Sequence, residues 1–202
     1  MKRYNMKLYK NIIISVLVVV IVGVGVATCF AFVIPPKDSI KTFEYPSEYF
    51  CNVETSYIDY QTNENCSAFA SAYVLRCLGV DVDGKTIESK IKRFFGFVSS
   101  ASIVRVFKQY GFGAKAYYGD INTLKTRLSV GVPIIVFISI PNDTHYAVVV
   151  GYDEQNFYLV DSLTQNKNSN EKRYNRIIKA EEFDNIWKTD SIIPNNVYIV
   201  AE

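Results

Sequence analysis

The chain has one histidine, one tryptophan, two methionines and four cysteines among 202 residues. Any reaction that needs an imidazole therefore has a single candidate, His145. So few cysteines exclude a disulfide scaffold, and no pair of them has metal-ligand spacing, so we expect no metal and no cofactor. Cys51 and Cys77 remain an open alternative pair in an oxidising compartment, although nothing in the sequence brings them together. No internal repeat is present.

The chain also lacks a basic cluster. The formal net charge is +2, but four of the 22 Lys and Arg residues lie within residues 1–10, and residues 1–34 contain no Asp or Glu. The remainder carries 18 basic residues against 20 acidic ones. This near-neutral balance gives no indication of nucleic acid as a partner.

The longest uncharged run is residues 12–34, which are 23 consecutive positions dominated by Ile, Val, Phe and Ala. As a helix, such a run is about 34 Å long, enough to cross a hydrocarbon core of about 30 Å. A cleaved signal peptide is the alternative, but its apolar region is usually only about 7–15 residues long. We therefore predict a transmembrane helix over 12–34 that contacts the lipid bilayer. The basic residues before it predict a cytoplasmic N-terminus (1–11) and a single-pass protein of the cell membrane, with residues 35 onward outside.

The residues after this segment predict a linker over 35–56 and one domain over 57–202. Apolar periodicity and turn residues indicate helices over 65–78, 85–93, 100–110, 121–129 and 180–187. Runs rich in Val, Ile and Tyr indicate strands over 113–118, 133–140, 146–152, 157–161 and 197–201, with a polar loop over 164–170. Helices come first and strands later, which predicts an α+β fold with a mostly antiparallel sheet.

Cys66 lies at the start of the first helix of this domain. It opens an apolar stripe of i, i+3, i+4 spacing, and Asn65 is the predicted N-cap. The N–H-rich end of a helix favours a thiolate, which is the form that attacks a carbonyl carbon. The alternative is that Cys66 is a small buried apolar residue, an interpretation that fits the mid-helix Cys77 better.

His145 opens a predicted strand 79 residues after Cys66, and Asp161 ends the next strand. This order suits a base and a residue that orients it. A two- or four-residue hairpin loop would place the two side chains on opposite faces, so we predict an odd loop or a bulge between them. Asp143 and Asp153 are weaker alternatives for the orienting role.

Gln61 precedes Cys66 by five residues, on the loop that enters the helix. Its amide is a candidate to join the Cys66 backbone N–H in binding an oxyanion. Asn63 and Asn65 are competing donors in the same loop.

Four segments together resemble a known family: Gln61 with residues 65–70, Gly131–Val136, His145–Tyr152 and Phe157–Asp161. They are similar to the papain-like, bacteriocin-processing cysteine peptidases of the double-glycine leader type. The resemblance implies a papain-like fold and a thiol peptidase that acts on a peptide or small protein. It implies roles as nucleophile for Cys66, base for His145, orienting residue for Asp161 and oxyanion donor for Gln61. Asn65 and Ser67 replace the family's usual Asp and Gly beside the cysteine.

Two other functions stay open from the sequence. An NlpC-type cell-wall peptidase also has Cys before His, although the 79-residue separation is long for that class. The second alternative is a non-catalytic module that binds a peptide on the same fold.

Overall fold

The computed structural model describes residues 2–54, 56–93, 96–189 and 194–202, and only the backbone of residues 2–8 and 26–33. The chain divides into two compact units, Met1–Ile34 and Pro35–Glu202. Residues 35–56, for which the sequence predicts a linker, belong to the second unit by their contacts.

The first unit is one helix, α1 (Lys2–Val33), of 32 residues. Its described side chains, at positions 9–25, are all exposed. The predicted span 12–34 includes residues 26–33, whose side chains lie outside the described residues. Among the residues that are described, no helix has the length and apolar character needed to cross a membrane.

The second unit is built around one seven-stranded sheet with the order β2-β7-β3-β4-β5-β6, and β1 pairs with the far end of β4. All pairings between these strands are antiparallel, which confirms the predicted α+β class. The strands are β1 (Tyr49–Phe50), β2 (Ala114–Tyr118), β3 (Ile134–Ile140), β4 (Asp143–Tyr152), β5 (Asn156–Val160), β6 (Arg176–Lys179) and β7 (Val197–Ala201).

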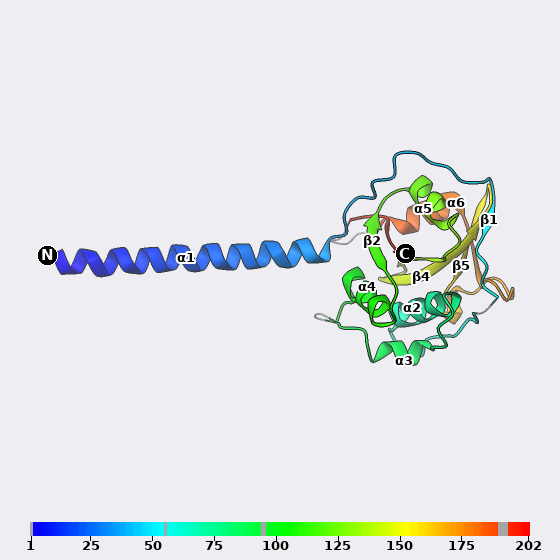
Figure 1. Ribbon diagram of the computed structural model, residues 1–202, viewed down its shortest axis with the longest axis horizontal. Coiled ribbons are helices and arrows are strands. Elements are labelled where there is room, and N and C mark those ends of the chain that lie inside the picture. Colours follow the sequence, from blue (N-terminus) through cyan, green and yellow to red (C-terminus); the bar gives the residue numbers. More distant parts are fainter. Residues whose placement is uncertain (1, 55, 94–95, 190–193) are drawn as a thin grey trace. The chain divides into compact units, whose positions relative to one another are not determined.

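Helices cover the sheet on both sides. They are α2 (Cys66–Cys77), α3 (Gly84–Glu88), α4 (Ser100–Gln109), α5 (Ile121–Leu128) and α6 (Ala180–Trp187), with a short 3-10 helix η1 (Thr164–Asn166). Figure 1 shows α2, α3 and α4 on one side of β4 and α5 and α6 on the other. The core of apolar side chains lies between these layers, with Trp187 fully buried in it.

Four elements differ from the sequence-based expectation. The helix predicted over 85–93 ends at Glu88, four residues after its start at Gly84. Strands β1 and β6 were not predicted, because they are two and four residues long and exist only by pairing with β4 and β5. The predicted loop 164–170 begins with η1.

A bulge shapes the β4–β5 hairpin. Val149 pairs with Leu159 and Gly151 with Tyr158, so Val150 is an extra residue in β4. The extra residue changes the alternation of side chains, and His145 and Asp161 therefore share one face of the sheet. This confirms the predicted bulge. Gly151 is required here because a Cβ at this position would lie 2.4 Å from the Phe50 ring of β1.

Candidate active site

The thiol of Cys66 lies at the first residue of α2, facing the start of β4. Asn65 occupies the predicted N-cap position, although its side chain makes no capping hydrogen bond, and Gly79 follows the helix with φ +87°, as the sequence predicts. The backbone N–H of Tyr146 donates to Cys66 Sγ across 3.4 Å. Cys66 is partly exposed, whereas the rest of α2 through Arg76 is buried. Cys66 is thus the partly exposed end of a buried helix, and its sulfur is contacted by a backbone donor.

His145 is held between Cys66 and Asp161. Its Nε2 lies 2.8 Å from Asp161 Oδ1, and its side chain is 2 % exposed. Burial lowers the pKa of His145, but the hydrogen bonds and charges of Asp161 and Cys66 outweigh burial and raise the pKa to about 9. The two neighbours thus favour the protonated imidazole.

The Asp161 carboxylate is the centre of this hydrogen-bond network, and it is inaccessible to solvent. Besides His145, Oδ1 accepts from the Leu163 N–H at 2.9 Å. Oδ2 accepts from Asn166 Nδ2 at 3.0 Å and from Arg176 NH1 at 2.8 Å. Burial raises the pKa of the Asp161 carboxyl. The hydrogen bonds and positive charges around it, first those of His145, lower the pKa by more, so that it lies below the usual value for aspartate. Asp161 is therefore a buried anion, and each of its two carboxylate oxygens accepts hydrogen bonds from two protein donors.

Asn175 holds the backbone of Asp161 in place. Its Oδ1 accepts from the Asp161 N–H at 2.8 Å, and its Nδ2 donates to the Asp161 C=O at 2.7 Å. The side-chain amide therefore acts as one more strand partner at the end of β5. No local motif in the sequence marks Asn166, Asn175 or Arg176 as site residues, because Asn166 lies in a polar loop and the other two lie just before and at the start of the unpredicted strand β6.

Gln61 is tied to the residue after Asp161. The Ser162 hydroxyl donates to Gln61 Oε1 at 2.7 Å, and the Gln61 N–H donates to the Ser162 C=O at 3.0 Å. The Gln61 side chain is thus held to the Asp161–Ser162 segment through Oε1.

The two competing amides of this loop are placed differently. The Asn65 side chain does not cap α2, and its Oδ1 accepts a hydrogen bond from Arg93, which also donates to the Glu64 C=O. Asn63 is exposed. Of the three amides considered, Gln61 is the one linked to the Asp161–Ser162 segment.

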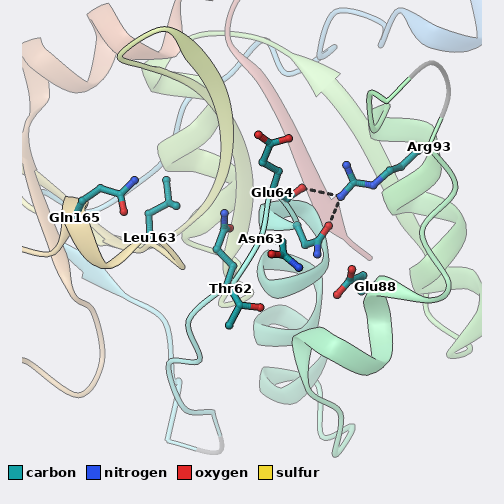
Figure 2. A pocket seen from close by; sticks show the side chains of 9 residues that line it. Thr62, Asn63, Glu64, Glu88, Arg93, Leu163 and Gln165 are labelled. Atoms are coloured by element: carbon teal, nitrogen blue, oxygen red, sulfur yellow. Dashed lines mark hydrogen bonds between the residues drawn. The ribbon is translucent and has the colours of Figure 1, made fainter.

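An open pocket of about 730 Å³ lies beside this loop. In Figure 2, Leu163 and Gln165 lie to one side of residues 62–64, and Glu88 and Arg93 lie to the other. Dashed lines mark the Arg93 hydrogen bonds that hold the loop. The pocket is lined by Gln61, Thr62, Asn63, Glu64, Asn65, Glu88, Arg93, Leu163 and Gln165.

Neither alternative aspartate contacts the imidazole. Asp143 is exposed and accepts from the Thr144 N–H. Asp153 stabilises the β4–β5 turn, where its carboxylate accepts from Gln155, Asn156 and Tyr158. Within the described residues, no three His, Cys, Asp or Glu side chains group to hold a metal ion, and Cys51, Cys66 and Cys77 are free thiols.

The profile of the Peptidase_C39 like family matches residues 53–192. The chain belongs to this family. It is accordingly a cysteine peptidase, and the family match favours this class over the NlpC-type and non-catalytic alternatives. No curated protein matches the chain by sequence.

Solved structures share the fold at low identity. The peptidase domain of Streptococcus ComA, a bifunctional ABC transporter of a quorum-sensing pathway, has a TM-score of 0.59 and 17% identity over 73% of this chain and 98% of its own. A putative C39-like peptidase from Bacillus anthracis has a TM-score of 0.59 and 16% identity over 76% and 96%. A double glycine motif protease from an AMS/PCAT transporter, solved with its leader peptide, has a TM-score of 0.57 and 18% identity over 75% and 93%.

Proposed function

We propose that this C39-like protein is a thiol peptidase with Cys66 as nucleophile, His145 as base, Asp161 as the residue that orients it, and Gln61 as oxyanion donor. The observation that carries the proposal is the chain of contacts from Cys66 through His145 to Asp161, with 2.8 Å between His145 Nε2 and Asp161 Oδ1. Nε2 faces Asp161, so Nδ1 is the ring nitrogen left to exchange a proton with the thiol.

Each step of the reaction uses a group already described. His145 holds the proton of Cys66 as imidazolium, and the thiolate attacks the peptide carbonyl carbon to form a C–S bond. The carbonyl oxygen becomes an oxyanion, which accepts from the Cys66 N–H and Gln61 Nε2. His145 then donates its proton to the leaving amine as the C–N bond breaks. Water, deprotonated by His145, cleaves the resulting thioester and restores the thiol.

The substrate we propose is a peptide with a double-glycine cleavage site. The support is the family match and the likeness of the fold to a double glycine motif protease solved with its leader peptide. In this proposal, the pocket beside Gln61 receives the peptide next to the scissile bond.

We also propose, from the sequence, that residues 12–34 anchor the enzyme in the cell membrane with the peptidase unit outside. The support is the uncharged run of 23 residues and the basic residues before it. Fusion of a reporter enzyme after residue 202 tests this topology. Activity of a reporter that works only in the cytoplasm would overturn the outside placement of the peptidase unit.

The test of the site is the rate of Cys66 alkylation by iodoacetamide against pH in the full chain, with C51S and C77S changes to leave one reactive thiol in the peptidase unit. A free thiol ionises at a pH of about 8.5, and a thiol paired with a histidine ionises at lower pH. We expect alkylation at pH 6 to be faster in the parent than in H145A, because only the parent has an imidazole that can take the thiol proton. Equal profiles in the two proteins would reject the proposed pair.

A further inference from the structure

Arg176 contacts Asp161 but has no role in the reaction steps proposed above. It is the first residue of β6, its side chain is 13 % exposed, and its NH1 lies 2.8 Å from Asp161 Oδ2. The imidazole of His145 contacts the other oxygen of the same carboxylate, also at 2.8 Å. One buried anion is therefore shared between a permanent cation and a titratable one.

The charges alternate along this row of side chains. Arg176 is positive and Asp161 negative; in the ion-pair state, His145 is positive and Cys66 negative. Inside a protein, a charge a few ångströms away acts strongly, because little water screens it. The guanidinium therefore offsets part of the attraction that Asp161 exerts on the imidazolium proton.

The neighbouring contacts distinguish a charge effect from simple support. Asn166 donates to the same Oδ2 atom from η1 without carrying a charge. Asn175 and the Leu163 N–H hold Asp161 without Arg176. The carboxylate thus has enough neutral donors to stay in place, and what Arg176 adds is its positive charge.

We propose that Arg176 is a positioning residue that keeps Asp161 ionised and weakens its hold on the His145 proton, so that His145 can pass this proton to the leaving amine. This inference rests on the proposed Cys66–His145–Asp161 site. The titratable or charged groups that act on His145 are Cys66 from α2 and Asp161 after β5, with Arg176 of β6 behind Asp161. The residue that pairs with His145 on the neighbouring strand β3, Ile138, is apolar.

The single histidine makes a direct test available. The full chain, labelled with ¹⁵N-histidine, purified through a histidine-free tag and held in detergent micelles, gives imidazole signals from His145 alone. A C66S background removes the titration of the thiol. The measurement is the pH midpoint of these signals in the parent, in R176M, R176Q and R176K, and in N166A as the matched loss of a neutral donor to the same oxygen.

We expect the midpoint to rise by on the order of one pH unit in R176M and R176Q, because the imidazolium no longer faces a second cation. R176K, which keeps the charge, and N166A, which removes only a hydrogen bond, are expected to stay within a few tenths of the parent. If R176M does not fold, R176Q carries the comparison. An unchanged or lowered midpoint in the folded R176 variants, or a rise no larger than that of N166A, overturns the proposal.

The same experiment separates this inference from the proposed function. If the midpoint of His145 in the parent is that of a free imidazole, about pH 6.5, and D161N does not change this midpoint, the proposed triad is rejected before any Arg176 variant is considered. If the parent midpoint is high and falls in D161N, the His145–Asp161 pair stands, and only the Arg176 comparison decides the role of the guanidinium.

Discussion

His145 and Asp161 meet on one face of the sheet, with Nε2 and Oδ1 2.8 Å apart, because β4 contains one residue more than β5 can pair. Without the bulge at Val150, the alternation of the hairpin would turn the two side chains to opposite faces. The contact at the candidate site therefore depends on a backbone irregularity five residues away from the histidine.

The raised pKa of His145 makes stability depend on pH. The pKa of His145 is about 9 in the folded protein and about 6.5 in the unfolded chain. The protonated histidine therefore stabilises the fold fully below about pH 6.5, and this contribution is lost as the pH rises through about 9. In a C66S background, Asp161 alone is left to raise the pKa of His145, so we expect the free energy of unfolding relative to H145Q to fall by about 1–2 kcal/mol between pH 6 and pH 10. Urea unfolding at the two pH values measures it. A difference that is constant, or that grows with pH, would contradict the raised value.

Gln61 is expected to matter for peptide cleavage and not for alkylation. Alkylation of a thiolate by iodoacetamide forms no oxyanion, whereas attack on a peptide carbonyl does. We expect Q61A to lower the cleavage rate of a double-glycine peptide roughly 100-fold or more and to leave Cys66 alkylation unchanged. S162A, which frees Gln61 Oε1 from its 2.7 Å hydrogen bond, should have the same pattern with a smaller loss. Parallel losses in both assays would instead show that the variants disturb the nucleophile.

A side chain at Gly151 is expected to destabilise the fold while Phe50 is present. A Cβ at this position would lie 2.4 Å from Phe50 Cδ1, and β1 pairs with β4 at this residue. We expect G151A to lower the free energy of unfolding by about 1–3 kcal/mol. The matched control is a double-mutant cycle with F50L, in which the smaller side chain should recover part of the loss. Additive effects of the two changes would show that the ring is not the cause.

Asp38 joins the start of the second unit to α5. Its buried carboxylate accepts from Arg127 Nε at 2.9 Å and NH2 at 3.0 Å, and from the Tyr198 hydroxyl. R127M leaves this carboxylate without its cation, so we expect a loss of about 3 kcal/mol in the free energy of unfolding. D38N/R127M should be more stable than R127M, because no buried charge is left unpaired. The reverse order in urea unfolding would refute a charge effect.

Some of this protein was predictable from local pattern alone. The helix start at Cys66, the glycine stop at Gly79 and the strand rich in Val after His145 follow from short-range capping and periodicity, which require no knowledge of distant residues. The single histidine restricted the base to one residue, and hairpin alternation implied an odd loop or bulge before its place was known.

The tertiary structure alone decided which residues surround Asp161. Asn166, Asn175 and Arg176 lie 5, 14 and 15 residues beyond it and meet it only because β6 pairs with β5 and η1 folds back over the strand end. Strand β6 has four residues and too little pattern of its own to be predicted. Sequence periodicity reports which face of an element is apolar; which elements become neighbours is set by the packing of the whole domain, and the environment of a buried charge depends on those neighbours.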